Sequence, residues 1–368
     1  MYLNVSVVNK IVIASDSFKG TLTSMEVADS VEKGIRSVFP CCEVVKLNVA
    51  DGGEGSMEAI CSARPAAFVD VEVSDPLGRP VRTSYAVLED GTAVIEMSRA
   101  SGLTLLAPSE RDPMKTSTYG TGEMIADALG RGYRRFIIGI GGSATNDAGT
   151  GMLSALGYRF FDASGRPVHP DGGSLHEIES IDLSSLNPAL TESEFIVACD
   201  VDSPLYGPEG AAYVFAPQKG ADADMVVTLD GGLRHFSEIA GYDASFSGAG
   251  AAGGLGYALK SFLNARMVKG IDLILDAIGF DDLILDASLV ITGEGRYDEQ
   301  TASGKTVDGV IRRARKHGVP VIVVAGSVAV PSPIAFCASS ADGSYATAED
   351  ISRTVERILL KISKSLAK

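Results

Sequence analysis

The sequence predicts an α/β protein of two domains, one of them assembled from both ends of the chain. Short apolar strands lead into loops and then helices near the N-terminus, and the same order returns near the C-terminus. Between these regions, residues 68–97 alternate with the two-residue period of antiparallel strands. At 368 residues, the chain is also longer than one average domain.

Two strand–loop–helix units open the chain. The first joins an apolar strand, Lys10 to Ser15, to a helix whose start, Thr23 to Glu26, has capping-box spacing. The second joins an alternating strand, Val44 to Ala50, to a helix from Ser56 to Ala63. Two core strands and an amphipathic helix repeat this rhythm near the other end of the chain, at residues 289–292, 319–325 and 348–366.

The middle of the chain follows a different pattern. Turn signals at Asp75-Pro76-Leu77-Gly78 and Asp90-Gly91 divide the alternating region into a hairpin or meander. Beyond it, residues 135–140 and 195–199 have the apolar composition of buried strands and lie beside glycine-rich loops.

These changes of pattern indicate the domain boundaries. We predict a discontinuous Rossmann-like or flavodoxin-like α/β domain of residues 1–66 and 285–368. A mixed-sheet α/β domain, residues 67–284, is inserted within it. Clefts between domains are common ligand sites, so we expect the functional site there.

Charge and cysteine content narrow the range of partners. The formal net charge of −15 repels nucleic-acid backbones and anionic membranes, so we expect no nucleic acid and no membrane as a partner. Residues 1–15 lack the apolar core of a signal peptide, and Gly326, Pro331 and Pro333 interrupt the most apolar stretch. Five cysteines without a disulfide or metal-type spacing indicate a reducing compartment, so we expect a cytoplasmic protein.

The loop Asp16-Ser17-Phe18-Lys19-Gly20 directly follows the first strand. Open α/β sheets bind ligands at this position, and the N-terminus of the next helix favours an anion. Lys19 could neutralise a phosphate and Ser17 could donate a hydrogen bond to it. A solvated surface turn has the same composition and remains the alternative.

The loop Asp51-Gly52-Gly53-Glu54-Gly55 places two carboxylates after the next strand. Carboxylates at a strand end can hold Mg²⁺ or accept a hydrogen bond from a substrate hydroxyl. An acidic turn without a ligand is the alternative.

The loop from Gly139 to Asp147 begins with the pattern G-x-G-x-x-A, and Asp162 follows about twenty positions on, as in dinucleotide-binding proteins. An NAD(P)-dependent oxidoreductase of a small hydroxy acid is therefore an alternative function. However, the polar and glycine residues that follow make a poor start for a packed helix. A nest of backbone N–H groups for phosphate explains the loop better. A similar pattern at Gly248 to Gly256 lacks a preceding strand and looks like chance.

Two further loops carry acidic residues after predicted strands. Asp200 and Asp202 would diverge on an extended strand, so we expect only one to face a ligand. The loop that begins at Gly293 contains Glu294, Arg296 and Asp298. Arginine can grip a carboxylate or phosphate through two hydrogen bonds, and aspartate can accept a hydroxyl proton.

Taken together and in order, these loops resemble the type 1 glycerate kinase family. The resemblance spans nearly the whole chain and implies a two-domain α/β kinase that uses ATP to phosphorylate D-glycerate, commonly giving 2-phosphoglycerate. The segments that carry it are residues 16–20, 50–55, 75–79, 118–123, 139–147, 199–204, 216–221, 250–256 and 292–300.

Phosphoryl transfer requires positioning, charge neutralisation and a deprotonated hydroxyl, and the loops supply candidates for each. For the ATP phosphates the candidates are Lys19, Ser17 and the loop residues Gly141, Gly142, Ser143 and Thr145. For the substrate they are Ser17, Arg79, Glu294 and Arg296. The proton acceptor would be Asp200 or Asp298, and the Mg²⁺ ligands would be Asp16, Asp51 and Glu54.

Two questions stay open at this point. A non-catalytic metabolite-binding protein is a third functional class, which would bind glycerate without producing ADP. A homo-oligomer is compatible with the sequence, which does not determine the number of subunits.

Overall fold

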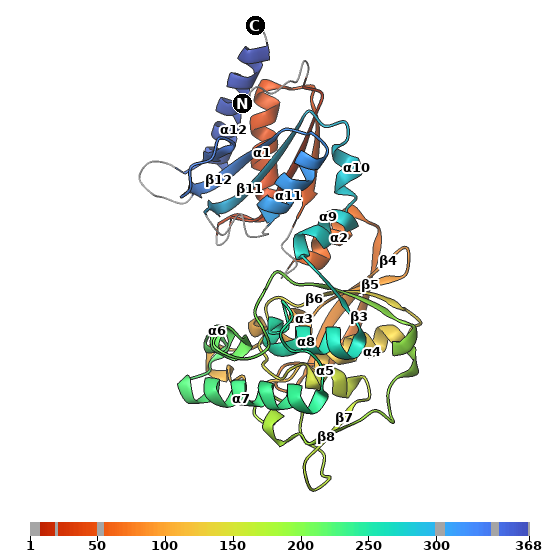
Figure 1. The fold of residues 1–368 in the computed structure, drawn as a ribbon. Helices are drawn as coiled ribbons and strands as arrows, with labels where there is room; N and C mark the ends of the chain where they lie inside the picture. The colour runs from red at the N-terminus through yellow and green to blue at the C-terminus, as the bar shows by residue number, and fades with distance from the viewer. Residues whose placement is uncertain (1–7, 19–20, 50–54, 299–305, 340–345, 367–368) are drawn as a thin grey trace. The chain divides into compact units, whose positions relative to one another are not determined.

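A computed structural model of the chain describes residues 8–18, 21–49, 55–298, 306–339 and 346–366. It divides into two compact α/β units (Figure 1). The first comprises Met1–Asp51, Glu58–Arg64 and Ile271–Lys368, and the second comprises Gly52–Met57 and Pro65–Gly270. The predicted fold class is confirmed.

The first unit contains a parallel sheet whose strands come from both ends of the chain. The colours of Figure 1 show this, because red and orange strands lie beside blue ones. Among the described residues the order is β13-β12-β11-β1-β2. Numbered within the unit from the β2 edge, this is 2-1-3-4-5, the flavodoxin-like order. The strands are β1 (Lys10–Ser15), β2 (Glu43–Asn48), β11 (Leu289–Tyr297), β12 (Val321–Val328) and β13 (Ala335–Cys337).

Helices α1 (Ser24–Val38) and α12 (Ala348–Leu366) pack against each other and share one core with β1 and β11. The predicted capping box of α1 is confirmed, since the Thr23 Oγ1 accepts from Glu26 N–H and the Glu26 carboxylate accepts from Thr23 N–H. The apolar stripe of α1 therefore faces the core as the sequence spacing requires, with Val27, Val31 and Ile35 buried.

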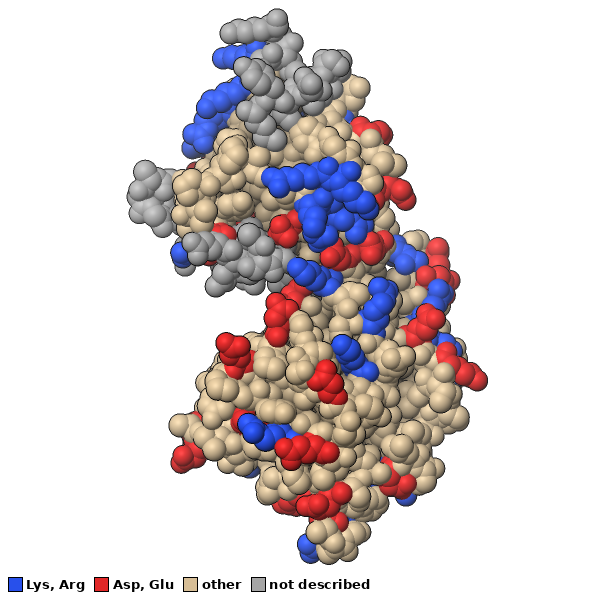
Figure 2. Space-filling view, in the orientation of Figure 1, with Lys and Arg blue, Asp and Glu red and all other residues tan. Residues whose placement is uncertain are grey.

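Helices α9 (Gly270–Ala277) and α10 (Phe280–Ile284) correct one predicted boundary, because from Ile271 on they belong to the first unit rather than to the inserted one. Ion pairs tie them to α11 (Thr306–Lys316), over which Lys and Arg gather in Figure 2. Arg313 Nη1 lies 2.7 Å from Asp276 Oδ1, and Arg313 Nε lies 2.6 Å from Asp281 Oδ1. These pairs link residues distant in sequence, which the strand and helix pattern could not show.

The strand β11 is longer than predicted. We expected residues 293–297 to form a loop, but β11 continues to Tyr297, which pairs with Val328 of β12. Ladder pairing with a long neighbour outweighs the low strand propensity of the two glycines and of Glu294. Consequently Glu294 and Arg296, two residues apart on a strand, share one face of the sheet.

The second unit contains a mixed sheet in the order β10-β9-β6-β5-β4-β3 among the described residues. The predicted meander is confirmed, because β3, β4 and β5 pair antiparallel, whereas β5, β6, β9 and β10 are parallel. The strands are β3 (Ala66–Ser74), β4 (Pro80–Leu88), β5 (Thr92–Glu96), β6 (Arg135–Gly139), β9 (Glu194–Ala198) and β10 (Arg266–Val268), with β7 (Arg159–Phe161) and β8 (Ser180–Asp182) in a separate pair.

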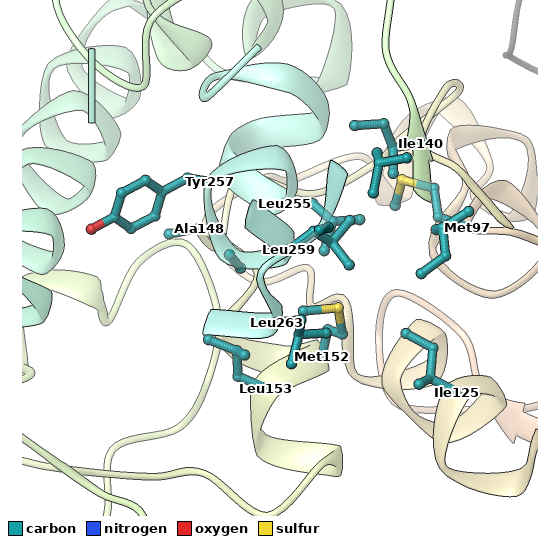
Figure 3. Packing of buried hydrophobic residues seen from close by; sticks show 14 of the residues in the cluster. Met97, Ile125, Ile140, Ala148, Met152, Leu153, Leu255, Tyr257, Leu259 and Leu263 are labelled. Atoms are coloured by element: carbon teal, nitrogen blue, oxygen red, sulfur yellow. The ribbon is translucent and has the colours of Figure 1, made fainter. Parts of the chain in front are cut away.

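One large apolar core fills the second unit. Figure 3 shows side chains of α5 and α8, among them Met152, Leu255 and Leu259, gathered in it. This core holds the ends of the parallel strands in place, so the loops that follow them are anchored. The remaining α-helices are α2 (Ser56–Ala63), α3 (Ser98–Ser101), α4 (Tyr119–Gly130), α5 (Thr150–Ala155), α6 (Ala211–Phe215), α7 (Ala223–Ala240) and α8 (Ala251–Leu263).

No helix in the described ranges combines the length and the apolar character needed to cross a membrane.

The contact between α1 and α12 depends on Gly34. A Cβ there would lie 2.5 Å from the Ser352 carbonyl oxygen and 2.8 Å from Val355 Cβ. We expect Gly34→Ala to lower the free energy of unfolding of the first unit by about 1–2 kcal/mol, since backbone of α12 must move. Calorimetric unfolding measures this. Gly231→Ala, inside α7 with no atom within 4 Å of its Cβ, should instead stabilise by up to about 1 kcal/mol; equal effects would contradict the packing argument.

Candidate functional site

Asp16 lies at the point of the first unit where the strand order reverses, between β1 and β11. Its N–H donates to the Gly293 carbonyl oxygen at 2.9 Å, which anchors the turn to β11. Its carboxylate accepts from the Ser17 N–H at 2.7 Å and from the Thr306 hydroxyl at 3.0 Å. In open parallel sheets, ligands bind at this reversal point.

Glu294 and Arg296 lie in the second half of the neighbouring strand β11, and Asp298 directly follows that strand. Arg296 is exposed, and its Nε lies 3.3 Å from Asp298 Oδ2. Gly293 does not serve a ligand, because a Cβ there would lie 2.2 Å from the Val324 carbonyl oxygen of the neighbouring strand. The structure thus brings Asp16, Ser17 and the β11 residues together at the carboxyl end of the two strands.

Three predicted site residues, Lys19, Asp51 and Glu54, lie outside the described residues. Within the described ranges, no group of three or more His, Cys, Asp or Glu is placed to hold a metal ion. The predicted metal site therefore remains a prediction.

The glycine-rich loop of the second unit follows the carboxyl end of β6. Pairing with residues 101–103 fixes its shape: Leu103 N–H donates to Gly142 O, and Ala144 N–H donates to Ser101 O, both at 2.9 Å. Gly142 has φ of 73°, which favours glycine. In the part of the chain that the structure describes, the N–H groups of Gly141, Gly142 and Ser143 have no acceptor. A nest of this kind could bind an anion, and the phosphate-binding role of these residues remains a prediction.

The dinucleotide-binding interpretation of this loop does not match the backbone. A Rossmann fingerprint requires a helix directly after the glycines. Here Ala148 and Gly149 are left-handed, with φ of 51° and 74°, and the next helix, α5, has only six residues. The loop therefore lacks the helix N-terminus on which a dinucleotide pyrophosphate would lie.

Asp147 is fully buried and anchors the loop. Its Oδ2 accepts from the N–H and the hydroxyl of Thr118, both at 2.7 Å, and from Gly151 N–H at 3.2 Å, while Oδ1 accepts from Gly149 N–H at 3.1 Å. Burial raises the pKa of Asp147, and these hydrogen bonds oppose that rise. The carboxylate thus fastens the start of α4 to the turn before α5.

Sequence reasoning missed Lys219. It ends a short 3₁₀ turn, Pro217–Lys219, and is only 2% exposed. Its Nζ donates to Ser143 Oγ at 2.8 Å and to the Thr145 carbonyl oxygen at 2.7 Å. Burial lowers the pKa of Lys219 to about 7, and the charge of Asp147 opposes that shift. The motif around Lys219 was visible in the sequence, but its distance from the loop, more than seventy residues, hid the contact.

The second glycine pattern, taken as chance above, also belongs to this region. Ala252, Gly253 and Gly254 are all left-handed, with φ of 53°, 68° and 93°. Gly253 O accepts from Ala148 N–H at 3.0 Å, and a Cβ on Gly253 would lie 2.0 Å from Thr145 O. Two strained turns therefore meet behind the loop.

Asp200 and Asp202 diverge, as expected. Asp200 Oδ1 accepts from the Gly270 N–H at the start of α9, at 2.9 Å, and Asp202 Oδ1 accepts from the Ser247 hydroxyl at 2.6 Å. Arg79 is occupied, because its Nε lies 2.6 Å from Asp75 Oδ2 and its Nη1 2.6 Å from Glu110 Oε1. These pairs hold Arg79 at the turn between β3 and β4, and its contact with the substrate remains a prediction.

Comparison with known proteins agrees with this arrangement. A model of the glycerate kinase family matches residues 11–365. A glycerate kinase of Bacillus subtilis (strain 168) is 50% identical over 325 residues, which cover 87% of this chain and 85% of that protein. A glycerate 2-kinase of Escherichia coli (strain K12) is 47% identical, with the same two shares covered.

A solved structure gives the same result for the fold. The crystal structure of a protein described as glycerate kinase 2 from Salmonella typhimurium LT2 is 40% identical, with a TM-score of 0.84. The alignment covers 98% of this chain and 100% of that one. The chain therefore belongs to the glycerate kinase family and is a kinase.

Proposed function

We propose that this kinase transfers the γ-phosphoryl group of ATP to the 2-hydroxyl of D-glycerate, in the presence of Mg²⁺, and gives 2-phosphoglycerate. The observation that carries the proposal is the position of Asp16 and Ser17 at the reversal point of a flavodoxin-like sheet. The name of the Escherichia coli relative, glycerate 2-kinase, supports the choice of hydroxyl. A cytoplasmic location remains part of the proposal on the sequence grounds given above.

The anionic donor requires positive charge and N–H donors. The N–H groups of Gly141, Gly142 and Ser143 supply donors for phosphate oxygens, and Lys19 supplies charge. For the substrate carboxylate, Arg296 is a candidate, since its side chain is 70% exposed and its recorded ion pair in the described residues is with Asp298. Ser17 and Glu294 lie near the carboxyl ends of the adjacent strands β1 and β11 and would contact the substrate hydroxyls.

Mg²⁺ would be held by Asp16, together with Asp51 and Glu54. Carboxylate oxygens at a strand end are the donors that this ion prefers, and Asp16 is held in place by Ser17 and Thr306. When bound, Mg²⁺ neutralises charge on the transferring phosphoryl group.

Asp200 or Asp298 would orient and deprotonate the attacking hydroxyl. Both are held by neighbours, Asp200 by the Gly270 N–H and Asp298 by Arg296. A fixed carboxylate can accept a hydroxyl proton without first reorienting.

The product distinguishes the two hydroxyls. The purified enzyme with ATP, Mg²⁺ and D-glycerate should release ADP and give a ³¹P resonance split into a doublet, because the carbon at position 2 carries one hydrogen. A triplet would show phosphorylation at position 3, and ADP release with a different hydroxy acid alone would contradict the substrate assignment.

Nucleotide choice separates the kinase from the oxidoreductase alternative. ATP with Mg²⁺ should raise the melting temperature in a thermal-shift assay, by an amount equivalent to about 2.7 kcal/mol at one hundred times the dissociation constant. NAD at the same concentration should leave it unchanged, because the loop after β6 lacks a Rossmann helix. A shift with NAD and none with ATP would contradict the assignment of this loop.

Paired substitutions identify the base. Either Asp298→Asn or Asp200→Asn should lower kcat by about 10²–10⁴-fold, the usual effect of losing a general base. Asparagine keeps the shape of the aspartate side chain, and at position 200 its amide oxygen can still accept the hydrogen bond from the Gly270 N–H. Asp202→Asn is the matched control, since Asp202 is also exposed and contacts Ser247. Near-normal kcat in both test variants would rule out the base assignment.

A further inference from the structure

Lys219 is a buried ammonium group with unused donor capacity. It lies in the second unit with 2% exposure and donates to Ser143 Oγ and Thr145 O. An ammonium group has three N–H donors, and these two bonds are the ones the structure records for it. Burying such a group costs free energy unless its partners compensate fully.

The adjacent side chains are also unsatisfied. Thr145 and Asn146 are both fully buried. Among the described residues, Thr145 Oγ1 and both Asn146 side-chain atoms, Nδ2 and Oδ1, have no hydrogen-bond partner. Buried polar side chains in native proteins are usually hydrogen-bonded, so several unpaired groups in one loop point to a missing ligand.

The donors outnumber the acceptors in this set. Ser143 Oγ accepts from Lys219, which leaves its own proton free to donate. The Thr145 hydroxyl, the Asn146 amide and the N–H groups of Gly141 to Ser143 add further donors. A cluster of donors that includes a lysine amine fits an oxyanion better than a metal ion.

A purely internal ion pair with Asp147 does not explain the arrangement. The carboxylate of Asp147 already accepts four hydrogen bonds from Thr118, Gly149 and Gly151. No hydrogen bond joins it to Lys219 in the described residues. In addition, Ala148 and Ala252 hold left-handed backbone, a strained conformation for alanine that is concentrated at ligand sites.

We propose that Lys219, Ser143, Thr145 and Asn146 form a buried subsite for one oxyanion group of the reacting molecules. This inference rests on the proposed function, and it adds Lys219 and Asn146 to the loop residues considered above. The oxyanion is either the carboxylate of the hydroxy acid or a phosphate of the nucleotide. Both present the same chemistry to the pocket, and the experiment separates them.

The test uses the full chain and two near-isosteric variants, Lys219→Met and Thr145→Val. Calorimetric titration measures binding of D-glycerate and of ATP with Mg²⁺, each alone, and steady-state assays give KM for each. We expect the variants to weaken binding of one of the two about 10- to 100-fold, the effect of losing a hydrogen bond to a charged group. Weaker binding of glycerate identifies the carboxylate, and weaker binding of ATP identifies a phosphate.

Thermal unfolding distinguishes a binding role from a structural one. Thr145→Val replaces a buried hydroxyl that has no recorded partner, so its melting temperature should equal or exceed that of the unsubstituted protein. Lys219→Met also removes the hydrogen bonds to Ser143 Oγ and Thr145 O, so its melting temperature should fall. Lys260→Met is the control, since Lys260 is an exposed lysine of the same unit that lies over the Phe246 ring. It should change neither affinity by more than about twofold, in line with small surface effects.

Two results would overturn the subsite. One is unchanged affinity for both ligands in Lys219→Met and Thr145→Val. The other is a lowered melting temperature in both variants, with affinity loss no greater than in Lys260→Met. Failure of the proposed function has a separate signature, which is the absence of ADP release by the unsubstituted protein with any hydroxy acid.

Discussion

The pairing of β1 with β11 is the interaction on which the rest of this structure depends. It joins Ile11, Val12 and Ile13 to Leu289, Val290 and Ile291 in a parallel ladder. All six side chains are buried, so the pairing combines hydrogen bonds with the centre of an apolar core. Because parallel strands need a crossover connection, the long segment between them is free to form a second unit.

The same pairing creates the site of the first unit. Strand order reverses between β1 and β11, and the loops after the two strands diverge to opposite faces. Asp16 lies where the two loops diverge. Its N–H donates a hydrogen bond to the Gly293 carbonyl oxygen, and its carboxylate accepts one from the Thr306 hydroxyl. A carboxylate that had to be ordered by its ligand would bind more weakly, because ordering costs entropy.

Much of this could be predicted from sequence because the signals are local. The capping box at Thr23, the turn at Asp90-Gly91 and the strand alternation each depend on neighbouring residues. The extension of β11 to Tyr297, the attachment of α9 to α11 and the contact of Lys219 with Ser143 depend on partners far along the chain. No local pattern encodes such contacts. The Gly248–Gly256 pattern was misjudged for the same reason, because its left-handed turn is explained only by the backbone of Thr145 against it.

The order in which the chain is synthesised has a consequence for folding in the cell. The β1–β11 ladder and the packing of α12 on α1 both join segments from opposite ends of the chain. The first unit therefore cannot be completed until the last helix has left the ribosome, whereas residues 65–270 contain a core of their own. At a synthesis rate of roughly 5–20 residues per second, the apolar strand Lys10–Ser15 waits many seconds for its partner. During that interval the side of β1 that pairs with β11 lacks its partner, and an unpaired strand edge of this kind can pair with other chains.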